Sequence, residues 1–185
     1  MSDAMQIGVD NFHFAPLTKD DATSFTYGSI VAVPGLSEIT ITPETTNATF
    51  YADNGAYAVA TGLGKVTVEI SLADIPLEVQ AALLGHTLNA GIMVKKSTDS
   101  APYVAVLCRT LKSNGKYRYL ELTKGKFELV TDTAKTKGES ISLEAQKIKG
   151  TFIPRINDKE WMRSADEDVT GYLPETGTAW FTTVG

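Results

Sequence analysis

The sequence predicts a mainly β fold with one α-helix packed against a sheet. Two segments, Ser37–Thr42 and Lys65–Ile70, alternate apolar and polar residues, which is typical of half-buried strands with one solvated face. A third segment, Tyr103–Leu111, is apolar on both faces and therefore predicts a central strand. Clear helical spacing of apolar residues occurs at Ile75–Gly85, and one amphipathic helix in a β-rich chain packs on a sheet.

The N-terminal part contains two further predicted strands. In Met5–Leu17 the alternation slips by one residue between Val9 and Phe12, and a β-bulge there would return the later residues to the inner face. The next strand, Tyr27–Val33, ends at a Pro-Gly pair.

Residues 43–64 are predicted to form a long inter-strand loop. They are rich in Thr, Asn, Ala and Gly, are nearly free of Leu and Ile, and contain a turn signal at Tyr51–Gly55. Hairpin loops usually have about two to five residues. Because long loops with aromatic and small apolar residues commonly carry function, we expect this one to contact another chain.

The predicted helix, about residues 74–85, has recognisable ends. Asp74 can cap it, Pro76 suits its first turn, and Gly85 is a natural stop. Its expected buried face consists of Ile75, Val79, Ala82 and Leu83.

The second half returns to β structure. Gly91–Lys95 predicts a short strand, and the Asn-Gly turn at Ser113–Lys116 predicts a hairpin between Tyr103–Leu111 and Tyr117–Leu122. Phe127–Val130 and Ile141–Ile153 are expected to add further strands.

The composition changes after Arg155, so we divide the chain into a β domain, residues 1–155, and a C-terminal extension, residues 156–185. The extension contains a possible strand at Trp161–Ala165, an acidic loop at Asp166–Gly171, and an aromatic end. The extension is too short to bury a hydrophobic core of its own, so we expect it to pack on its own domain or on a neighbouring subunit.

Composition narrows the classes of function. The 185 residues carry a formal net charge of −5, which argues against a protein that binds nucleic acid by neutralising phosphates. The one cysteine, Cys108, excludes an internal disulfide framework and Cys-based zinc fingers. Neither a signal-peptide pattern nor an apolar stretch long enough to span a bilayer occurs.

Few residues could carry chemistry. His13 is expected to be an edge-strand or surface histidine, and His86 to complement the end of the helix. Neither has Cys or His at metal-ligand spacing, so we expect no metal site. Cys108 is expected to be a buried, inert thiol.

Two other sequence patterns could in principle carry phosphate binding or acid–base catalysis. Thr61–Thr67 is similar to a phosphate loop but has Val59 where a glycine is required and Val66 where Ser or Thr is required, so a glycine turn before a strand fits better. The carboxylate pairs, Asp20 with Asp21 and Asp166 with Asp168, are expected in solvated polar loops. We therefore predict no catalytic, cofactor-binding or metal-binding residues and no enzyme, which favours a structural or assembly protein.

Taken in order, several segments resemble the major tail proteins, or tail tube proteins, of long-tailed, non-contractile phages and prophages of Gram-positive bacteria. No single motif is diagnostic, but their order and spacing are specific, and the resemblance covers Ile7–Val184. The segments are Thr42–Gly55, Gly64–His86, Ala101–Phe127, Lys135–Ser140, Gly150–Arg155, and the acidic stretch followed by the closing Ala-Trp-Phe-Thr-Thr-Val.

The resemblance implies a β-sandwich or barrel-like tail-tube fold with one flanking helix. It also implies rings, typically hexameric, that stack into a tube around a tape measure protein. Further partners would be the tail initiator or distal tail protein and the terminator protein, with DNA only as transiting cargo and no membrane partner. The protein would be made in the host cytoplasm and reside in the virion tail, without catalytic residues or a cofactor.

Within such a tube, particular surfaces acquire expected roles. Thr46–Gly62 would reach the next ring or a neighbouring subunit, and Trp161–Val184 would dock on an adjacent surface. Because a conduit for DNA must not bind it, an acidic or neutral lumen is expected. The lumen candidates are Thr40, Thr42, Thr67 and Glu69.

Three alternatives stay open at this point. The chain could be another ring component of the tail, such as a distal tail or terminator subunit. It could be a carbohydrate-binding β-sandwich module that uses Tyr51, Tyr57, Trp161 and Trp180 as stacking platforms. An enzyme is the third alternative, disfavoured by the weak inventory of histidines and carboxylates.

Overall fold

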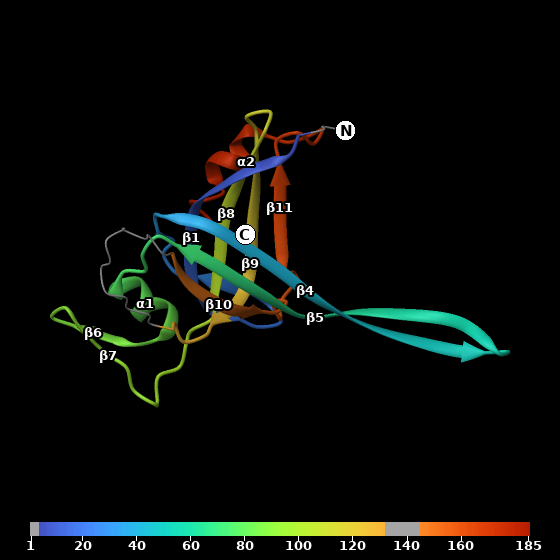
Figure 1. Cartoon of the computed structure of the whole chain (residues 1–185), viewed down its shortest axis with the longest axis horizontal. Coiled ribbons are helices and arrows are strands. Elements are labelled where there is room, and N and C mark those ends of the chain that lie inside the picture. Colours follow the sequence, from blue (N-terminus) through green and yellow to red (C-terminus); the bar gives the residue numbers. More distant parts are fainter. Residues whose placement is uncertain (1–3, 132–144) are drawn as a thin grey trace, which may run out of the picture.

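The computed structural model of the chain describes residues 4–131 and 145–185. The segment 132–144, which includes residues 135–140 of the resemblance and the start of the strand predicted at Ile141–Ile153, lies outside the described residues. The elements (Figure 1) are β1 (Gln6–Asp20), β2 (Phe25–Tyr27), β3 (Val31–Ala32), β4 (Leu36–Ala52), β5 (Gly55–Leu72), α1 (Leu77–Leu84), β6 (Thr87–Asn89), β7 (Ile92–Val94), β8 (Val104–Lys112), β9 (Tyr117–Phe127), β10 (Gln146–Phe152), β11 (Met162–Asp166) and α2 (Pro174–Ala179).

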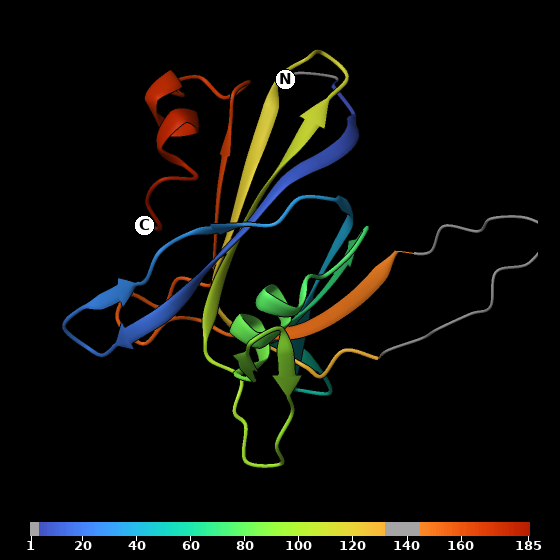
Figure 2. The same cartoon turned by 90° about the vertical axis from the view of Figure 1, so that its left-hand side faces the viewer.

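One antiparallel sheet in the order β2-β1-β8-β9-β10-β5-β4 organises the described chain. β3 pairs with β1, and β11 pairs with the first half of β9, whose end pairs with β10. The sheet curls until β4 comes back near β1, but its edges do not close into a barrel. Figures 1 and 2 show that the curled sheet resembles a sandwich, which confirms the predicted mainly β fold.

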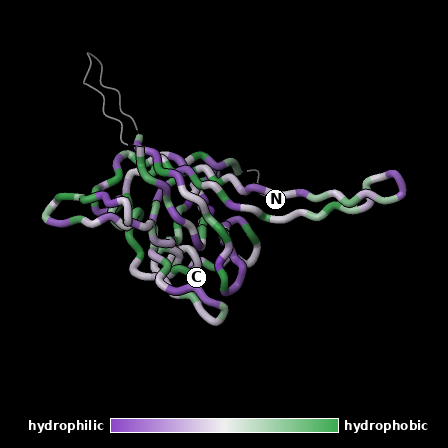
Figure 3. Tube along the Cα trace, turned by 90° about the horizontal axis from the view of Figure 1, so that it is seen from below, coloured by the Kyte–Doolittle hydropathy of each residue, from purple (hydrophilic) through white to green (hydrophobic). Residues whose placement is uncertain are grey.

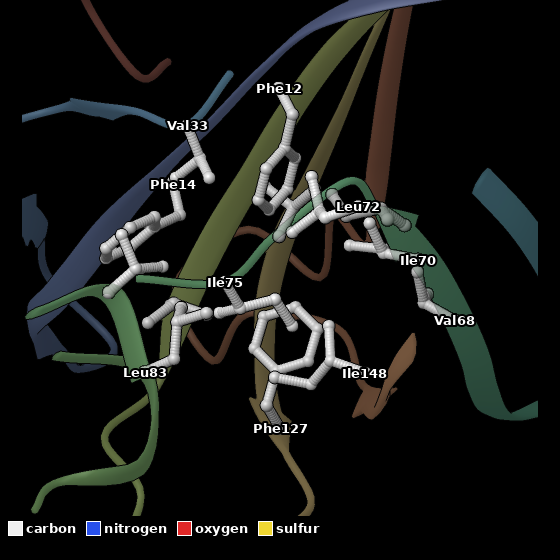
Figure 4. Packing of buried hydrophobic residues seen from close by; sticks show 14 of the residues in the cluster. Phe12, Phe14, Val33, Val68, Ile70, Leu72, Ile75, Leu83, Phe127 and Ile148 are labelled. Atoms are coloured by element: carbon white, nitrogen blue, oxygen red, sulfur yellow. The ribbon is translucent and has the colours of Figure 1, made fainter. Parts of the chain in front are cut away.

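The main core lies between the inner faces of the curled sheet and α1 (Figure 4). The predicted alternation on β5 is confirmed, because Val66, Val68 and Ile70 are completely buried. Burial of a side chain of this size stabilises the fold by about 1.5–3 kcal/mol. β8 lies between β1 and β9 and is buried along nearly its whole length, which confirms its prediction as a central strand.

The predicted bulge in β1 is confirmed. The pairing of β1 with β8 shifts between Asp10 and His13, and Asn11 adopts a left-handed conformation with φ of 61°. Phe12 and Phe14 both enter the core as a result. Ile7 does not, because it lies opposite the far end of β8, where 64% of its surface is exposed.

The prediction of a loop at residues 43–64 is wrong. β4 and β5 continue through this segment as paired strands, from Thr45 opposite Leu63 to Ala52 opposite Gly55. Asp53 and Asn54 form the tight turn, both with positive φ, as the turn signal indicated. The shortage of Leu and Ile reflected a lack of core contacts, while Thr and aromatic residues still favour strands. We call residues 43–64 the arm.

The helix and its stop are confirmed, but the cap is not. α1 begins at Leu77, two residues after Ile75, and ends at Gly85, whose φ is 72°. Pro76 occupies the cap position without a side-chain hydrogen bond, and Asp74 takes no part. Ala82 is exposed instead of buried, and the helical residues that face the core are Val79, Gln80, Leu83 and Leu84.

The remaining elements differ in detail from the predictions. The Asn-Gly hairpin between β8 and β9 and the strand near Trp161–Ala165, seen as β11, are confirmed. β9 ends at Phe127, so residues 128–130 add no strand. The segment Tyr27–Val33 contains the last residue of β2 and the whole of β3. The short strand β6 and the helix α2 had not been predicted.

Candidate assembly surfaces

The arm extends away from the body of the molecule (Figure 1), and the pairings described for it from Thr45–Leu63 to Ala52–Gly55 join its own two strands. Its aromatic residues Phe50, Tyr51 and Tyr57 are 64–73% exposed, and Val59 is 64% exposed. Phe50 and Tyr57 meet edge to face, with ring centroids 6.3 Å apart. Figure 3 shows that hydrophilic colour on the arm is concentrated at its tip, where Asp53 is the one charged residue between positions 45 and 64. Several large apolar side chains exposed on one short ribbon favour an interaction site.

The predicted lumen residues are brought together on one face of the sheet. Thr40 lies opposite Glu69, and Thr42 lies opposite Thr67. All but Thr67, which is half-buried, are exposed. Because side chains alternate along a strand, the buried residues Val66, Val68 and Ile70 point to the opposite face of β5. The four residues therefore share a solvated face, as the alternation indicated.

Charges on this face are balanced where the strands meet. β10 places Lys149 opposite Glu69, and Lys65 lies 3.5 Å from Glu44. Opposite charges side by side on a sheet partly neutralise one another. In the described part of the chain, this face is therefore mixed in charge.

The two carboxylates of the acidic loop are not solvated as predicted, although residues 169–171 are exposed. Asp166 and Asp168 both accept hydrogen bonds from Lys112, whose side chain is only 5% exposed, and each carboxylate is 12% exposed. Burial raises the pKa of Asp166, but the hydrogen bond from Lys112 and further bonds hold that pKa below its usual value. The pair is structural: it ties the β8–β9 turn to the end of β11.

The second carboxylate pair also departs from the prediction. Asp20 is buried, contacts Lys124 at 2.6 Å and accepts the backbone N–H groups of Ile156 and Asn157. Asp21, in contrast, stays at the surface and holds the following turn through Thr23. Asp20 therefore fastens the beginning of the C-terminal extension to β1.

Sequence reasoning did not single out Arg155, which is 1% exposed and joins three parts of the chain. It donates hydrogen bonds to the Gly185 carbonyl at 2.6 Å, to Asp158 at 2.7 Å and to Glu160 at 3.0 Å. Its guanidinium also lies 3.9 Å from the ring centroid of Phe25. The sequence around Arg155 carries no signal for its burial, because its partners Gly185 and Phe25 lie far from it along the chain.

The remaining residues singled out in the sequence, two histidines, the cysteine and a glycine-containing segment, pack against other parts of the fold or lie within a strand. His13 is half-buried on β1, and its ring packs at a tilt against that of Phe181. The side chain of His86 is buried, with Nδ1 2.8 Å from Asp99. Cys108 is buried, and burial raises its pKa to about 12, which confirms the inert thiol. Thr61–Thr67 lies within β5, so no helix begins there.

Residues 4–131 and 145–185 contain no group of three or more His, Cys, Asp or Glu side chains that could hold a metal ion. Over the same ranges, neither helix has the length and apolar character required to cross a membrane.

The described residues thus form a β-structured domain from which a two-stranded arm protrudes. Comparison with protein families identifies the class more narrowly, because the family model described as phage tail tube protein matches residues 32–168. This match covers well over half of the chain, so the chain belongs to the phage tail tube protein family. The family gives it a structural role in the tail of the virion. A comparison with curated proteins gives no match.

Proposed function

We propose that this chain is the repeating subunit of the tail tube of a non-contractile phage or prophage of a Gram-positive host. Copies close into rings, most simply hexamers, and the rings stack around a tape measure protein. The tube grows from the initiator or distal tail complex, ends at the terminator, and later conducts DNA. The observation that carries the proposal, beyond family membership, is the exposed apolar arm.

The dimensions of the arm suit contact between subunits. Strand residues 43–52 span roughly 30 Å at the rise of an antiparallel strand. In a free monomer, an exposed two-stranded ribbon with few charges is prone to associate through its strand edges and aromatic residues. In a homopolymer with head-to-tail contacts, the same surface becomes buried on the next copy.

The solvated face with Thr40, Thr42, Thr67 and Glu69 is proposed to line the lumen. Threonine hydroxyls and paired opposite charges offer DNA phosphates no continuous positive track. We further propose that residues 1–155 form the ring-building domain and that residues 156–185 are its extension.

Electron microscopy of the purified protein over a concentration series, with light scattering, tests this proposal. The informative variant carries Phe50→Ser and Tyr57→Ser, and its matched control is Leu129→Ser, because Leu129 is equally exposed but lies outside the arm. Hollow tubes from wild type and control, and none from the arm variant, are expected. If the protein alone stays monomeric, the same comparison is made with the tape measure protein coexpressed.

Two results would redirect the proposal. A single closed ring that never stacks would favour a terminator or distal tail subunit. Tubes from the arm variant with wild-type yield would show that the arm does not mediate stacking.

A carbohydrate-binding role has less support, because Trp180, one of its four candidate platforms, is 7% exposed and packs inside the molecule.

A further inference from the structure

The sequence contains two Asn-Gly pairs, and both lie in hairpin turns. Asn54-Gly55 is at the tip of the arm, and Asn114-Gly115 is in the turn between β8 and β9. In such a pair the backbone nitrogen of glycine can attack the side-chain amide carbon of asparagine, because glycine has no Cβ to obstruct the approach. All four residues are exposed to solvent, so exposure alone does not distinguish the two sites.

The side chain of Asn114 is held at both ends of its amide. Its Nδ2 donates hydrogen bonds to both carboxylate oxygens of Asp168, each at 3.0 Å, and its Oδ1 accepts one from the Lys116 N–H group at 3.1 Å. Asp168 is only 12% exposed and is fixed in turn by Lys112. The amide carbon can reach the nitrogen of Gly115 only if the side chain leaves these partners, so the fold opposes the attack.

Asn54 lacks such restraints. Within residues 4–131 and 145–185, its side chain makes no hydrogen bond or ion pair. A Cβ added to Gly55 would meet no atom within 4 Å, so the space around the attacking nitrogen is open. The tip lies at the far end of the arm (Figure 1), which has no buried residue. The tip can therefore open locally without losing core contacts.

We propose that Asn54 is a site of spontaneous deamidation, through which a subunit that stays unassembled loses its competence to join a tube. The nitrogen of Gly55 forms a bond to Cγ of Asn54, and the proton of that nitrogen leaves with the side-chain amino group as ammonia. Water then opens the five-membered succinimide to aspartate or isoaspartate. Either product adds a negative charge beside Asp53, the one charged residue between positions 45 and 64.

Both products change the tip. The turn consists of Asp53 and Asn54, with φ of 49° and 59°, and sets Ala52 opposite Gly55. Isoaspartate inserts a methylene group into the backbone and alters this two-residue turn. A second carboxylate also has to be desolvated wherever a neighbouring copy covers the tip. The effect on assembly rests on the proposed function, whereas the reaction itself does not.

Peptide mass spectrometry of the full-length chain after incubation at pH 8 tests the reaction. In the folded protein we expect Asn54 to be converted at least about tenfold faster than Asn114. In urea the two rates should converge, because neither side chain is then held. Equal rates in the folded protein would overturn the proposal. A difference that persists unchanged in urea would also overturn it, because the fold would then not be its cause.

A pair of glycine variants separates the chemistry from the mobility of the arm. Gly55→Ala introduces no clash and no positive φ, yet its methyl group obstructs the attacking nitrogen, so conversion of Asn54 should slow at least about tenfold. The matched control is Gly62→Ala, also on the arm with nothing within 4 Å, and it should convert Asn54 as wild type does. Wild-type conversion in G55A would contradict attack by the Gly55 nitrogen.

The effect on assembly has its own readout. Aged and fresh protein are mixed under tube-forming conditions, and the tubes are separated from the supernatant by sedimentation. We expect deamidated Asn54 to be depleted from the tubes at least about tenfold. Equal content in both fractions would reject the effect on assembly. Absence of tubes even with the tape measure protein would reject the proposed function and leave the measured rates unchanged, whereas tubes from a chain whose Asn54 is stable would reject only this inference.

Discussion

Replacing Lys112 with methionine tests the buried ionic cluster at the β8–β9 turn. Methionine keeps much of the aliphatic stem but removes the ammonium group that donates to Asp166 and Asp168. Both carboxylates are 12% exposed, so they would lose the partner that offsets their burial. Lys116 and Arg118 remain nearby at more exposed positions.

The expected loss of stability follows from this geometry. Removing one partner of a buried ion pair costs about 3–5 kcal/mol. Because Lys116 and Arg118 still offer partial compensation, we expect the lower end, about 3 kcal/mol for Lys112→Met. For a chain of this size that corresponds to a decrease in Tm of roughly 6–12 °C.

Urea unfolding at pH 7, followed by tryptophan fluorescence, measures the effect. The matched control is Lys116→Met, whose side chain is 50% exposed and which contacts the same Asp168 at 3.1 Å. A surface pair contributes at most about 1 kcal/mol, so the control should lie close to wild type. Equal losses for the two variants would refute the reasoning, since burial would then not decide the strength of the cluster.

The pH dependence of the same variant supplies a second check. The pKa of Asp166 is depressed in the folded state, so its contribution is present above the unfolded value of 3.8 and is lost as pH falls through the folded value. In Lys112→Met that acid-induced loss should shrink. An unchanged acid limb would contradict the assignment of Lys112 as the main partner.

Three further predictions concern single sites. Gly125→Ala would place a Cβ 2.3 Å from the ring of Phe152 and should destabilise the fold by about 1–3 kcal/mol, whereas Gly62→Ala on the open arm, with nothing within 4 Å, should change the urea midpoint little. Burial raises the pKa of Glu121 from 4.5 to about 7, so the folded state retains a proton that the unfolded state loses, and the free energy of unfolding falls as pH rises through that window. Glu121→Gln should remove this pH dependence in urea titrations and raise the free energy of unfolding by up to about 3 kcal/mol at pH 8. An unchanged pH dependence would contradict the prediction. Cys108 should react with a thiol reagent only at the rate of unfolding, and rapid labelling of the native protein would show that the strand is more open than described.

Local chemistry made several elements predictable. The alternation in Lys65–Ile70 indicated which face of the strand is buried in the core, and the phase slip before Phe12 indicated the bulge. Gly85 and the Asn114-Gly115 turn were predictable because few residue types adopt a positive φ without a steric cost, and glycine is the main one. In each case, the determining interaction lies within a few residues along the chain.

The errors arose where the partner is distant. Residues 43–64 lack core contacts, so their composition looked like a loop, although cross-strand pairing makes them an arm. The carboxylates of Asp166 and Asp168 looked solvated because Lys112, which neutralises them, lies more than 50 residues earlier. Hydropathy of a segment does not reveal a partner brought in by sheet topology.

By itself, the sequence determined the β class, the one amphipathic helix, the burial of Cys108 and, through the order of its segments, the tail tube family. The tertiary structure alone decided that the arm protrudes from the body, that Arg155 binds the Gly185 carbonyl, and that Trp180 packs on Leu107 and Tyr119. The physical reason is range: periodicity and turn propensity act over a few residues, whereas buried charge pairs and packed faces join residues that only the folded chain brings together.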